Sequence, residues 1–345
     1  MLAKAHYNVM VRVAVTELEF HKAEARFARA AAEGFDCVAV PAEEAALAGA
    51  IRVREIRHAI VGVERYCGLL YQTLSKGGVI GRFGVGHDGV DKAQATANGL
   101  LCTNTPGALD DSVAEHTINL LFAAARHTVG QAAAVRAGSW SPQVGTELRG
   151  KTLAVIGCGA IGRRVAQIAA RGLEMKVVGC EVADLDVERM QREFGFTTVV
   201  KDFADAVKRA DLVSLHIPSV PATRHFLNRE RLGLLGAGCW IVNTARGALV
   251  DEIALFDALS GGRLAGAALD VFECEPYSPV AAGKDLRALP NVIMTPHISS
   301  STREACDRMA SRALRNVQLA EAGKYDEMDL LNPEVMASLD DKGNL

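Results

Sequence analysis

The sequence predicts an α/β protein with two doubly wound parallel-sheet domains. Short apolar segments alternate with segments of helical period along almost the whole chain, which is typical of parallel strands joined by crossover helices. The chain has 345 residues. A single hydrophobic core rarely grows that large, so two domains are expected.

The first part of the chain contains short apolar segments that we interpret as strands. They are Val9–Val15, Asp36–Val40, His58–Val61, Val79–Arg82 and Leu101–Thr103. Between the first two, Leu18–Glu33 has the apolar spacing of a helix, and Gly34 is typical of a helix end. This alternation predicts a parallel sheet that helices cover on both faces.

A longer helix is expected to begin near Ser112. Ser112 and Glu115 have the spacing of a capping box, and apolar residues then recur at helical spacing as far as Ala125. A polar loop around Trp140 follows, and a second alternating series starts at Lys151.

The second series predicts further strands and helices. The strands are Thr152–Ile156, Lys176–Cys180, Leu212–Leu215, Trp240–Asn243, Ala265–Val271 and Val292–Met294. The helices are Ala160–Arg171, Val187–Phe194, Glu252–Ser260 and a final amphipathic helix over Arg303–Ala322.

Composition and charge exclude several function classes. The net charge of −3 gives no electrostatic reason to expect binding to nucleic acid or to an anionic membrane. No apolar stretch approaches the ~20 residues of a membrane span, and Met1–Glu19 lacks the continuous apolar segment of a secretory signal. The eight cysteines are scattered without a C-x-x-C pair, which favours reduced thiols, a cytoplasmic location and no metal site.

A glycine-rich loop follows the strand expected at Thr152–Ile156 and leads into a helix. Its pattern is G-x-G-x-x-G in the strand–turn–helix context that binds dinucleotides, although a plain turn remains the alternative. The helix dipole and free amide groups there attract the pyrophosphate. The loop residues predicted to bind the cofactor are Gly157, Gly159, Ala160, Ile161 and Gly162.

Glu181 ends the next expected strand, 19 residues after Gly162. A carboxylate at this position accepts hydrogen bonds from the ribose hydroxyls and repels a 2′-phosphate, so NAD is favoured over NADP. The alternative is a solvated carboxylate at a strand end.

Three later segments each place a charged residue after an expected strand. They carry Arg246, Glu275 and His297. Ligands bind at the carboxyl ends of strands in open α/β sheets, so the three residues suit one shared site. The spacing alone also allows a structural histidine and a turn arginine.

These residue types match the chemistry of a 2-oxo acid. An arginine fork binds a carboxylate bidentately and polarises the adjacent carbonyl. While a nicotinamide supplies hydride to carbon, a histidine is a natural proton donor to oxygen. A neighbouring carboxylate stabilises the imidazolium form of that histidine.

The chain resembles the D-2-hydroxyacid dehydrogenase family from about Gly78 to Arg312, whereas residues 1–75 match only weakly. The stretches that carry the resemblance are Val79–Gly86, Asn104–Gly107, Ser112–Thr117, Glu147–Thr152, the glycine loop, Leu215–Pro218, Asn243–Gly247, Asp270–Phe272 and Pro296-His297.

The resemblance implies a role for individual residues. Arg246 looks like the substrate-binding arginine, His297 like the acid and base, and Glu275 like its partner. Asp270 resembles a residue that contacts the nicotinamide carboxamide. The other residues that the resemblance assigns are His216, Pro218 and Thr244 near the cofactor, and Val85 and Gly86, whose backbone amides would bind the substrate carboxylate.

The family's fold would be two Rossmann-like domains with an interdomain cleft. Residues 1–111, completed by 303–345, would form the substrate domain, and residues 112–302 the NAD-binding domain. The resemblance also implies D(R) specificity and a homodimer formed through the cofactor domain, with the helix from Ser112 and the loop around Trp140 at the contact.

The sequence departs from the family pattern over Val61–Tyr66, which matches no named subfamily and leaves the substrate open. There, Arg65 is a candidate for binding a second anionic group and Tyr66 for hydrogen bonding to it, or both are ordinary loop residues.

Two other functions remain open: a phosphite dehydrogenase with the same three residues, and a corepressor-like scaffold that senses NAD. A formate dehydrogenase is disfavoured, because that enzyme has an amide where Glu275 stands.

Overall fold

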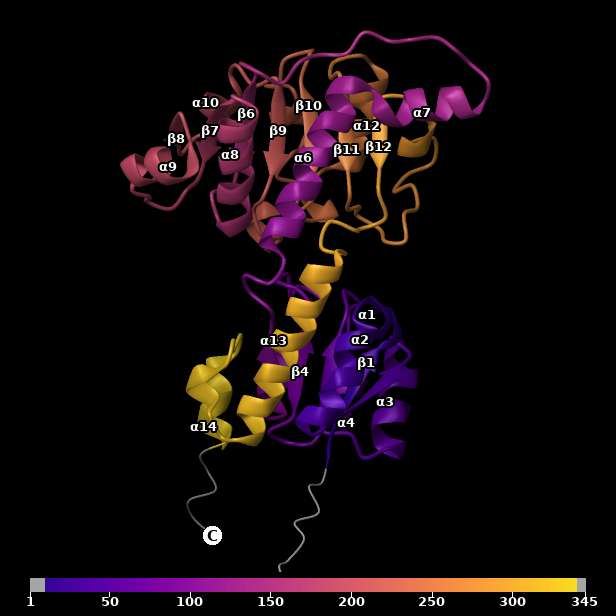
Figure 1. The fold of residues 1–345 in the computed structure, drawn as a ribbon, viewed down its shortest axis with the longest axis vertical. Coiled ribbons are helices and arrows are strands. Elements are labelled where there is room, and N and C mark those ends of the chain that lie inside the picture. The colour runs from indigo at the N-terminus through magenta and orange to yellow at the C-terminus, as the bar shows by residue number, and fades with distance from the viewer. Residues whose placement is uncertain (1–9, 340–345) are drawn as a thin grey trace, which may run out of the picture. The chain divides into compact units, whose positions relative to one another are not determined.

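The computed structural model describes residues 10–339, which divide into two compact units. Unit 1 contains the described residues up to Leu109 and those from Ser301 onward, and unit 2 runs from Asp110 to Ser300. Each unit is built on one parallel sheet with helices packed against it (Figure 1). The predicted α/β class with two parallel-sheet domains is therefore confirmed.

Unit 1 has a five-stranded sheet in the order β2-β1-β3-β4-β5, and all of its strand pairs are parallel. The strands are β1 Val11–Thr16, β2 Phe35–Val40, β3 His58–Val61, β4 Val79–Arg82 and β5 Leu101–Thr103. Val9, the first residue of the expected first strand, lies outside the described residues.

The helices of unit 1 are α1 Glu17–Lys22, α2 Glu24–Arg29, α3 Glu44–Val53, α4 Leu69–Thr73, α5 Lys92–Ala97, α13 Arg303–Glu321 and α14 Met336–Leu339. Helices α3, α4 and α5 share one buried apolar cluster with the sheet. Helix α13 comes from the far end of the chain and packs against β4 and α2. Unit 1 is therefore discontinuous in sequence.

Unit 2 has a seven-stranded parallel sheet in the order β12-β11-β10-β9-β6-β7-β8. The strands are β6 Thr152–Ile156, β7 Lys176–Cys180, β8 Thr198–Val200, β9 Leu212–Leu215, β10 Trp240–Asn243, β11 Gly266–Leu269 and β12 Val292–Met294. The carboxyl ends of all these strands lie at one edge, where the glycine loop and the three charged residues follow them.

Two layers of helices cover the sheet of unit 2. The helices are α6 Asp110–Arg126, α7 Thr128–Arg136, α8 Ala160–Gly172, α9 Val187–Phe194, α10 Phe203–Val207, α11 Arg229–Leu232 and α12 Glu252–Ser260. Alternate residues of β6 point to opposite faces, as a strand requires. Leu153 and Val155 pack with α6, α8 and α9, whereas Ala154 and Ile156 pack with α10, α11 and α12.

Some expected elements differ from those observed. The helix predicted over Leu18–Glu33 is broken at Ala23, so that α1, α2 and a short 3-10 turn replace it. Helix α6 begins at Asp110, before Ser112, so the predicted capping box is wrong. The Ser112 hydroxyl instead donates to the carbonyl oxygen of Ser299, 2.7 Å away. No helix among residues 10–339 is long and apolar enough to cross a membrane.

Candidate active site

The glycine loop after β6 is shaped by close backbone contacts. Gly157 has φ +97°, and a Cβ there would lie 2.6 Å from the carbonyl oxygen of His216. A Cβ on Gly162 would lie 2.1 Å from the carbonyl oxygen of Gly157. Only glycine fits at these two positions.

The start of α8 has the features that a pyrophosphate requires. Gly159 is the residue before the helix, it provides no side-chain cap, and a Cβ on it would meet nothing within 4 Å. The first helical residues, Ala160 and Ile161, lie at the positive end of the α8 dipole, where amide groups have no partner within the helix. The residues present fit a bound dinucleotide.

Glu181 lies directly beside this loop, at the end of β7. Its Oε2 accepts a hydrogen bond from the Cys158 amide at 3.0 Å, and its Oε1 accepts one from the Ala183 amide at 3.2 Å. The carboxylate is therefore held in place without a cationic partner among these contacts, as recognition of a ribose diol requires.

Two other residues assigned to the cofactor follow β9 and β10. His216 Nε2 lies 2.8 Å from Ser214 Oγ, and burial lowers the pKa of His216 to about 4, so the imidazole is neutral at pH 7. The buried Thr244 lies with its hydroxyl 2.9 Å from that of Thr117 on α6. Pro218 lies in the loop after His216, and its carbonyl accepts from the Thr223 hydroxyl at 2.7 Å.

Arg246 follows β10 in a loop that Asn243 organises. The Asn243 side chain donates to the Arg246 carbonyl at 2.8 Å and accepts from the Ala245 amide at 3.0 Å. Arg246 Nη1 also donates to the Ala245 carbonyl at 2.7 Å. The next residue, Gly247, packs so tightly that a Cβ would lie 1.8 Å from the Phe272 carbonyl carbon. The Arg246 loop therefore rests on the segment that leads to Glu275.

Glu275 and His297 form a hydrogen-bonded pair. His297 Nδ1 lies 2.7 Å from Glu275 Oε2, and the other carboxylate oxygen, Oε1, accepts from the Phe272 amide at 3.0 Å. Both side chains are partly exposed, at 22% for His297 and 28% for Glu275. With Nδ1–H donated to the carboxylate, His297 Nε2 remains available to a substrate.

Asp270, at the carboxyl end of β11, holds the turn that carries His297. Its side chain is fully buried, and its oxygens accept from the Thr295 hydroxyl at 2.5 Å and from the amides of Ile298 and Ser299 at 2.9 and 2.8 Å. Its carbonyl accepts from the His297 amide at 2.9 Å. Burial raises the pKa of Asp270, but these hydrogen bonds and one from His116 outweigh it and keep the pKa below its ordinary value.

This anchor explains the backbone of His297, which has φ +54° in the left-handed region. A non-glycine residue there is strained by about 1 kcal/mol or more and needs surrounding support. The Asp270 carboxylate supplies that support.

The candidate residues of unit 1 lie in loops after β3 and β4. Val85 and Gly86 are partly exposed, and Asn104 donates to the Val85 carbonyl at 2.8 Å. Arg65 is exposed. Tyr66 is not an exposed loop residue, because only 2% of it is accessible and its hydroxyl has no hydrogen-bond partner.

Sequence reasoning missed several residues that support this site. His116 on α6 lies 3.2 Å from the Thr295 hydroxyl and 3.6 Å from Asp270 Oδ1. Ser112 and His116 are four residues apart and so share a face of α6, but this spacing alone does not indicate that the face contacts the turn around His297. Glu252 and Glu273, considered below, gave no sequence signal.

No group of three or more His, Cys, Asp or Glu side chains within residues 10–339 is placed to hold a metal ion.

A dinucleotide-binding loop and a histidine–carboxylate pair at one sheet edge define the class of NAD-dependent oxidoreductases. The comparisons with known proteins agree. Residues 118–299 match the family model of the D-isomer specific 2-hydroxyacid dehydrogenase NAD binding domain. A glyoxylate reductase of Thermococcus litoralis is 37% identical over 269 residues, which are 75% of this chain and 78% of that protein.

Two further relatives extend the comparison. A D-3-phosphoglycerate dehydrogenase of Methanocaldococcus jannaschii is 43% identical over 229 residues, or 66% of this chain, but the match spans only 42% of that protein. The structure of a D-lactate dehydrogenase of Aquifex aeolicus, complexed with NAD and lactic acid, has a TM-score of 0.77 at 26% identity. That similarity covers 93% of this chain and 99% of the other.

The chain belongs to the D-isomer specific 2-hydroxyacid dehydrogenase family. It is thereby an NAD-dependent oxidoreductase, and unit 2 contains the family's NAD-binding domain.

Proposed function

We propose that the protein interconverts a small 2-oxo acid and its D(R)-2-hydroxy acid. The observation that carries the proposal is the 2.7 Å contact between His297 and Glu275, beside the Arg246 loop and on the sheet edge that bears the glycine loop. The names of the relatives support a substrate in the range from glyoxylate to lactate and phosphoglycerate.

Each of the three residues has a defined task in this reaction. Bound NADH supplies a hydride to C2 of the oxo acid. Arg246 binds the carboxylate of the substrate through its fork of N–H groups and polarises the carbonyl. His297 donates a proton from Nε2 to the carbonyl oxygen, and Glu275 stabilises the imidazolium form and fixes the ring through Nδ1. In oxidation, His297 accepts the hydroxyl proton instead.

The remaining assignments belong to the same proposal. The amides of Val85 and Gly86 would bind the substrate carboxylate, and Asp270 would contact the nicotinamide in addition to anchoring the turn. The residues proposed to line the cofactor site are Gly157, Gly159, Ala160, Ile161, Gly162, Glu181, His216, Pro218 and Thr244.

The direct test measures NADH oxidation against pyruvate, glyoxylate, hydroxypyruvate, phenylpyruvate, branched 2-oxo acids and phosphohydroxypyruvate. We expect turnover in the ordinary enzymatic range with at least one of them. Arg246→Ala should lower kcat/KM by about a thousandfold, because the charged fork is lost, while the affinity for NADH changes less than about threefold. Arg246→Lys keeps the charge without the fork and should recover only part of the rate.

Two alternatives are outcomes of this test. Turnover of phosphite with NAD, and of no 2-oxo acid, would indicate a phosphite dehydrogenase. Tight NADH binding without turnover on any substrate would indicate a scaffold. The named relatives are dehydrogenases and reductases, which favours the oxo-acid reaction.

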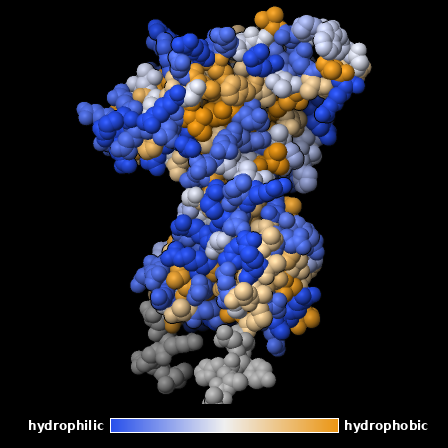
Figure 2. Space-filling view, in the orientation of Figure 1, coloured by the Kyte–Doolittle hydropathy of each residue, from blue (hydrophilic) through white to orange (hydrophobic). Residues whose placement is uncertain are grey.

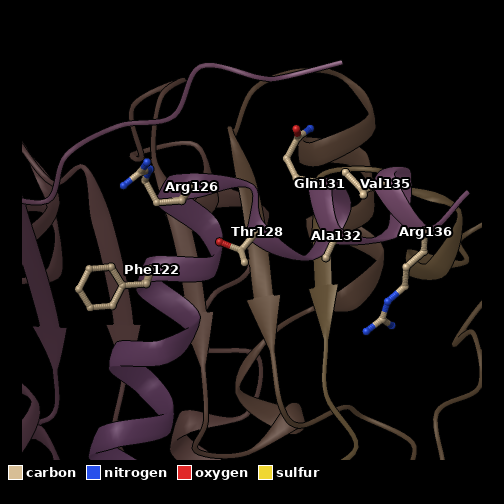
Figure 3. A pocket seen from close by; sticks show the side chains of 7 residues that line it. All are labelled: Phe122, Arg126, Thr128, Gln131, Ala132, Val135 and Arg136. Carbon is tan, nitrogen blue, oxygen red and sulfur yellow. The ribbon is translucent and has the colours of Figure 1, made fainter. Parts of the chain in front are cut away.

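We further propose a homodimer formed through α6 and α7. Helix α7 has no buried residue, and Phe122, Val129 and Val135 are 44%, 52% and 53% exposed. Apolar side chains gather on the visible face of unit 2 (Figure 2). The end of α6 and α7 line an open hollow of about 790 Å³ (Figure 3). A second copy of the chain is the occupant that the family resemblance suggests.

Sedimentation tests the dimer. Val129→Asp with Val135→Asp should convert a dimer into a monomer, whereas Val53→Asp, at an 83% exposed position of unit 1, should not. A wild-type monomer at micromolar concentration would contradict this part of the proposal.

A cytoplasmic location without nucleic-acid partners is also proposed, supported by eight free cysteines and a net charge of −3.

A further inference from the structure

Phe272 and the peptide bond that joins it to Glu273 are contacted from three directions. Gly247 packs against it so closely that a Cβ would lie 1.8 Å from the Phe272 carbonyl carbon and 2.4 Å from the Glu273 nitrogen. On the other side of Phe272, its own amide donates to Glu275 Oε1 at 3.0 Å. Phe272 thus connects the loop of Arg246, through the peptide unit after it, with the carboxylate that holds His297, through the peptide unit before it.

The third contact comes from α12. Glu252, the first residue of that helix, accepts a hydrogen bond from the Glu273 amide to its Oε1 at 2.7 Å. In return, Glu273 Oε1 accepts one from the Glu252 amide at 3.3 Å. The two glutamates therefore exchange carboxylate-to-amide hydrogen bonds across the gap between α12 and the turn.

Capping of α12 does not require Glu252. Asp251 is the N-cap residue, and its carboxylate accepts from the Ala254 amide at 2.9 Å. Glu252 is only 3% exposed, and burial raises its pKa against the hydrogen bond from Glu273, which lowers it. Burying a carboxyl group costs free energy, and here helix capping does not offset that cost. What the burial of Glu252 provides is its hydrogen bond with the Glu273 amide.

The surroundings of Glu252 and Glu273 are rich in ionisable groups. Glu273 Oε2 lies 2.8 Å from His225 Nε2 and 3.3 Å from Arg224 Nη2. Glu275, His225 and Tyr277 also interact electrostatically with Glu252. The backbone of His225 is also fixed, because its amide donates to the Ala248 carbonyl in the segment after Arg246.

We propose that Glu252 and Glu273 are positioning residues, which hold the Phe272–Glu273 peptide and thereby place Glu275 against His297. The inference rests on the proposed function, because it assigns to this pair the geometry of the proton-transfer site. Neither glutamate touches the reacting atoms in this account. Their effect passes through Glu275.

The experiment compares Glu252→Asp, Glu252→Gln and Glu252→Ala with the control Glu230→Gln, an exposed glutamate on α11, which packs against α12. Glu252→Asp keeps the charge but is one methylene too short to reach the Glu273 amide. Misplacement of a catalytic group by about 1 Å can cost about a hundredfold. We expect kcat for 2-oxo acid reduction to fall by about 10–100-fold in the Asp and Ala variants.

Other readouts separate positioning from general damage. The affinity for NADH, measured by fluorescence, should stay within about twofold in the Asp variant, because the glycine loop is untouched. The KM for the oxo acid should stay within about threefold, because Arg246 is unchanged, so the loss should appear in kcat. Glu252→Gln retains an acceptor oxygen and should recover the rate to within about threefold.

The outcomes distinguish the inference from the proposed function. Wild-type turnover together with unchanged kcat in folded Glu252→Asp would overturn the inference alone, as would equal damage in Glu252→Gln and Glu252→Ala. Failure of the wild-type protein to reduce any 2-oxo acid would end both. If Glu252→Ala does not fold, the Asp and Gln pair decides the question.

Discussion

In the proposed reaction His297 is the acid, and the contact of its Nδ1 decides which ring nitrogen carries the proton that moves. Nδ1 is bound to Glu275 at 2.7 Å, so the proton that moves is the one on Nε2. Asp270 keeps the backbone of His297 in a left-handed conformation through the neighbouring amides of Ile298 and Ser299. The two carboxylates thus have separate tasks: Glu275 binds the ring of His297, and Asp270 holds its backbone.

Glu275→Gln tests this division. The amide still accepts from the Phe272 amide but no longer carries the charge that stabilises imidazolium. We expect kcat/KM for reduction to fall by about 10–100-fold, because the proton donor loses this stabilisation. Glu188→Gln, at an exposed position of α9, is the control. A kcat/KM equal to that of the wild type would refute the role of Glu275.

Glu181 offers a second residue-scale prediction. Glu181→Gln keeps an acceptor for the Cys158 amide but removes the charge that repels a 2′-phosphate. The ratio of kcat/KM for NADH over NADPH should therefore fall by about tenfold or more, while Glu181→Ala should also weaken NADH binding. An unaltered cofactor preference in both variants would mean that another group reads the ribose.

At the scale of elements, the site depends on loops that touch after parallel strands end. The Arg246 loop after β10 lies on the Phe272–Glu273 peptide after β11, and the His297 turn after β12 is bound to Asp270 at the end of β11. Each of the three neighbouring strands is thus followed by one of the proposed catalytic residues. A parallel register is what brings them to the same edge.

Gly247→Ala probes this contact between loops. A Cβ would collide with the Phe272 carbonyl group, which is main chain and cannot swing aside. We expect a loss of about 1–3 kcal/mol in the free energy of unfolding and a kcat at least about tenfold lower. Gly238→Ala, where a Cβ would meet nothing within 4 Å, should leave both unchanged. Wild-type kcat in Gly247→Ala would show that the loop contact is not needed.

Sequence patterns predicted elements well where burial was strong and local. Strands such as His58–Val61 and Trp240–Asn243 are short apolar runs between polar residues, and their observed bounds equal the predicted ones. Strand β8 has three half-buried residues at a sheet edge, and α7 buries none, so neither left a clear apolar period. Ser112 was misread because its hydroxyl serves Ser299, a tertiary partner that local spacing cannot indicate.

The same limit applies to the site. Motif and spacing located the Glu275–His297 pair and the glycine loop, since each lies directly after a strand. The exchange between Glu252 and Glu273 joins residues 21 apart, and the contact of His116 with Thr295 joins residues 179 apart. Such partners are set by how helices pack on the sheet, which sequence period does not specify.

At the scale of the whole molecule, the N-terminal unit is completed by the far end of the chain. His58 on β3 is fully buried, with Nε2 3.2 Å from Glu321 Oε1 on α13 and Nδ1 accepting from the Val79 amide at 3.2 Å. An acceptor nitrogen must be unprotonated, so the fold selects neutral His58. Burial lowers the pKa of His58 to about 4, against the opposing charge of Glu321.

This burial predicts acid sensitivity. The unfolded chain protonates His58 near the ordinary value of about 6.5, before the folded chain does, so stability is lost as pH falls from about 6.5 to about 4. The loss should be on the order of 2–3 kcal/mol, seen as a falling Tm. His58→Gln should flatten this dependence, whereas exposed His21→Gln should not. The same acid slope in His58→Gln as in the wild type would contradict the prediction.

The central claim is that this chain moves a hydride between C4 of the nicotinamide and C2 of an oxo acid. The measurement incubates the protein with NADH that carries deuterium at both C4 positions and with the panel of 2-oxo acids, and it locates deuterium by NMR. We expect deuterium at C2 of one R-hydroxy acid with the wild-type protein and no such signal with His297→Ala. Deuterium in no hydroxy acid, despite bound NADH, would contradict it.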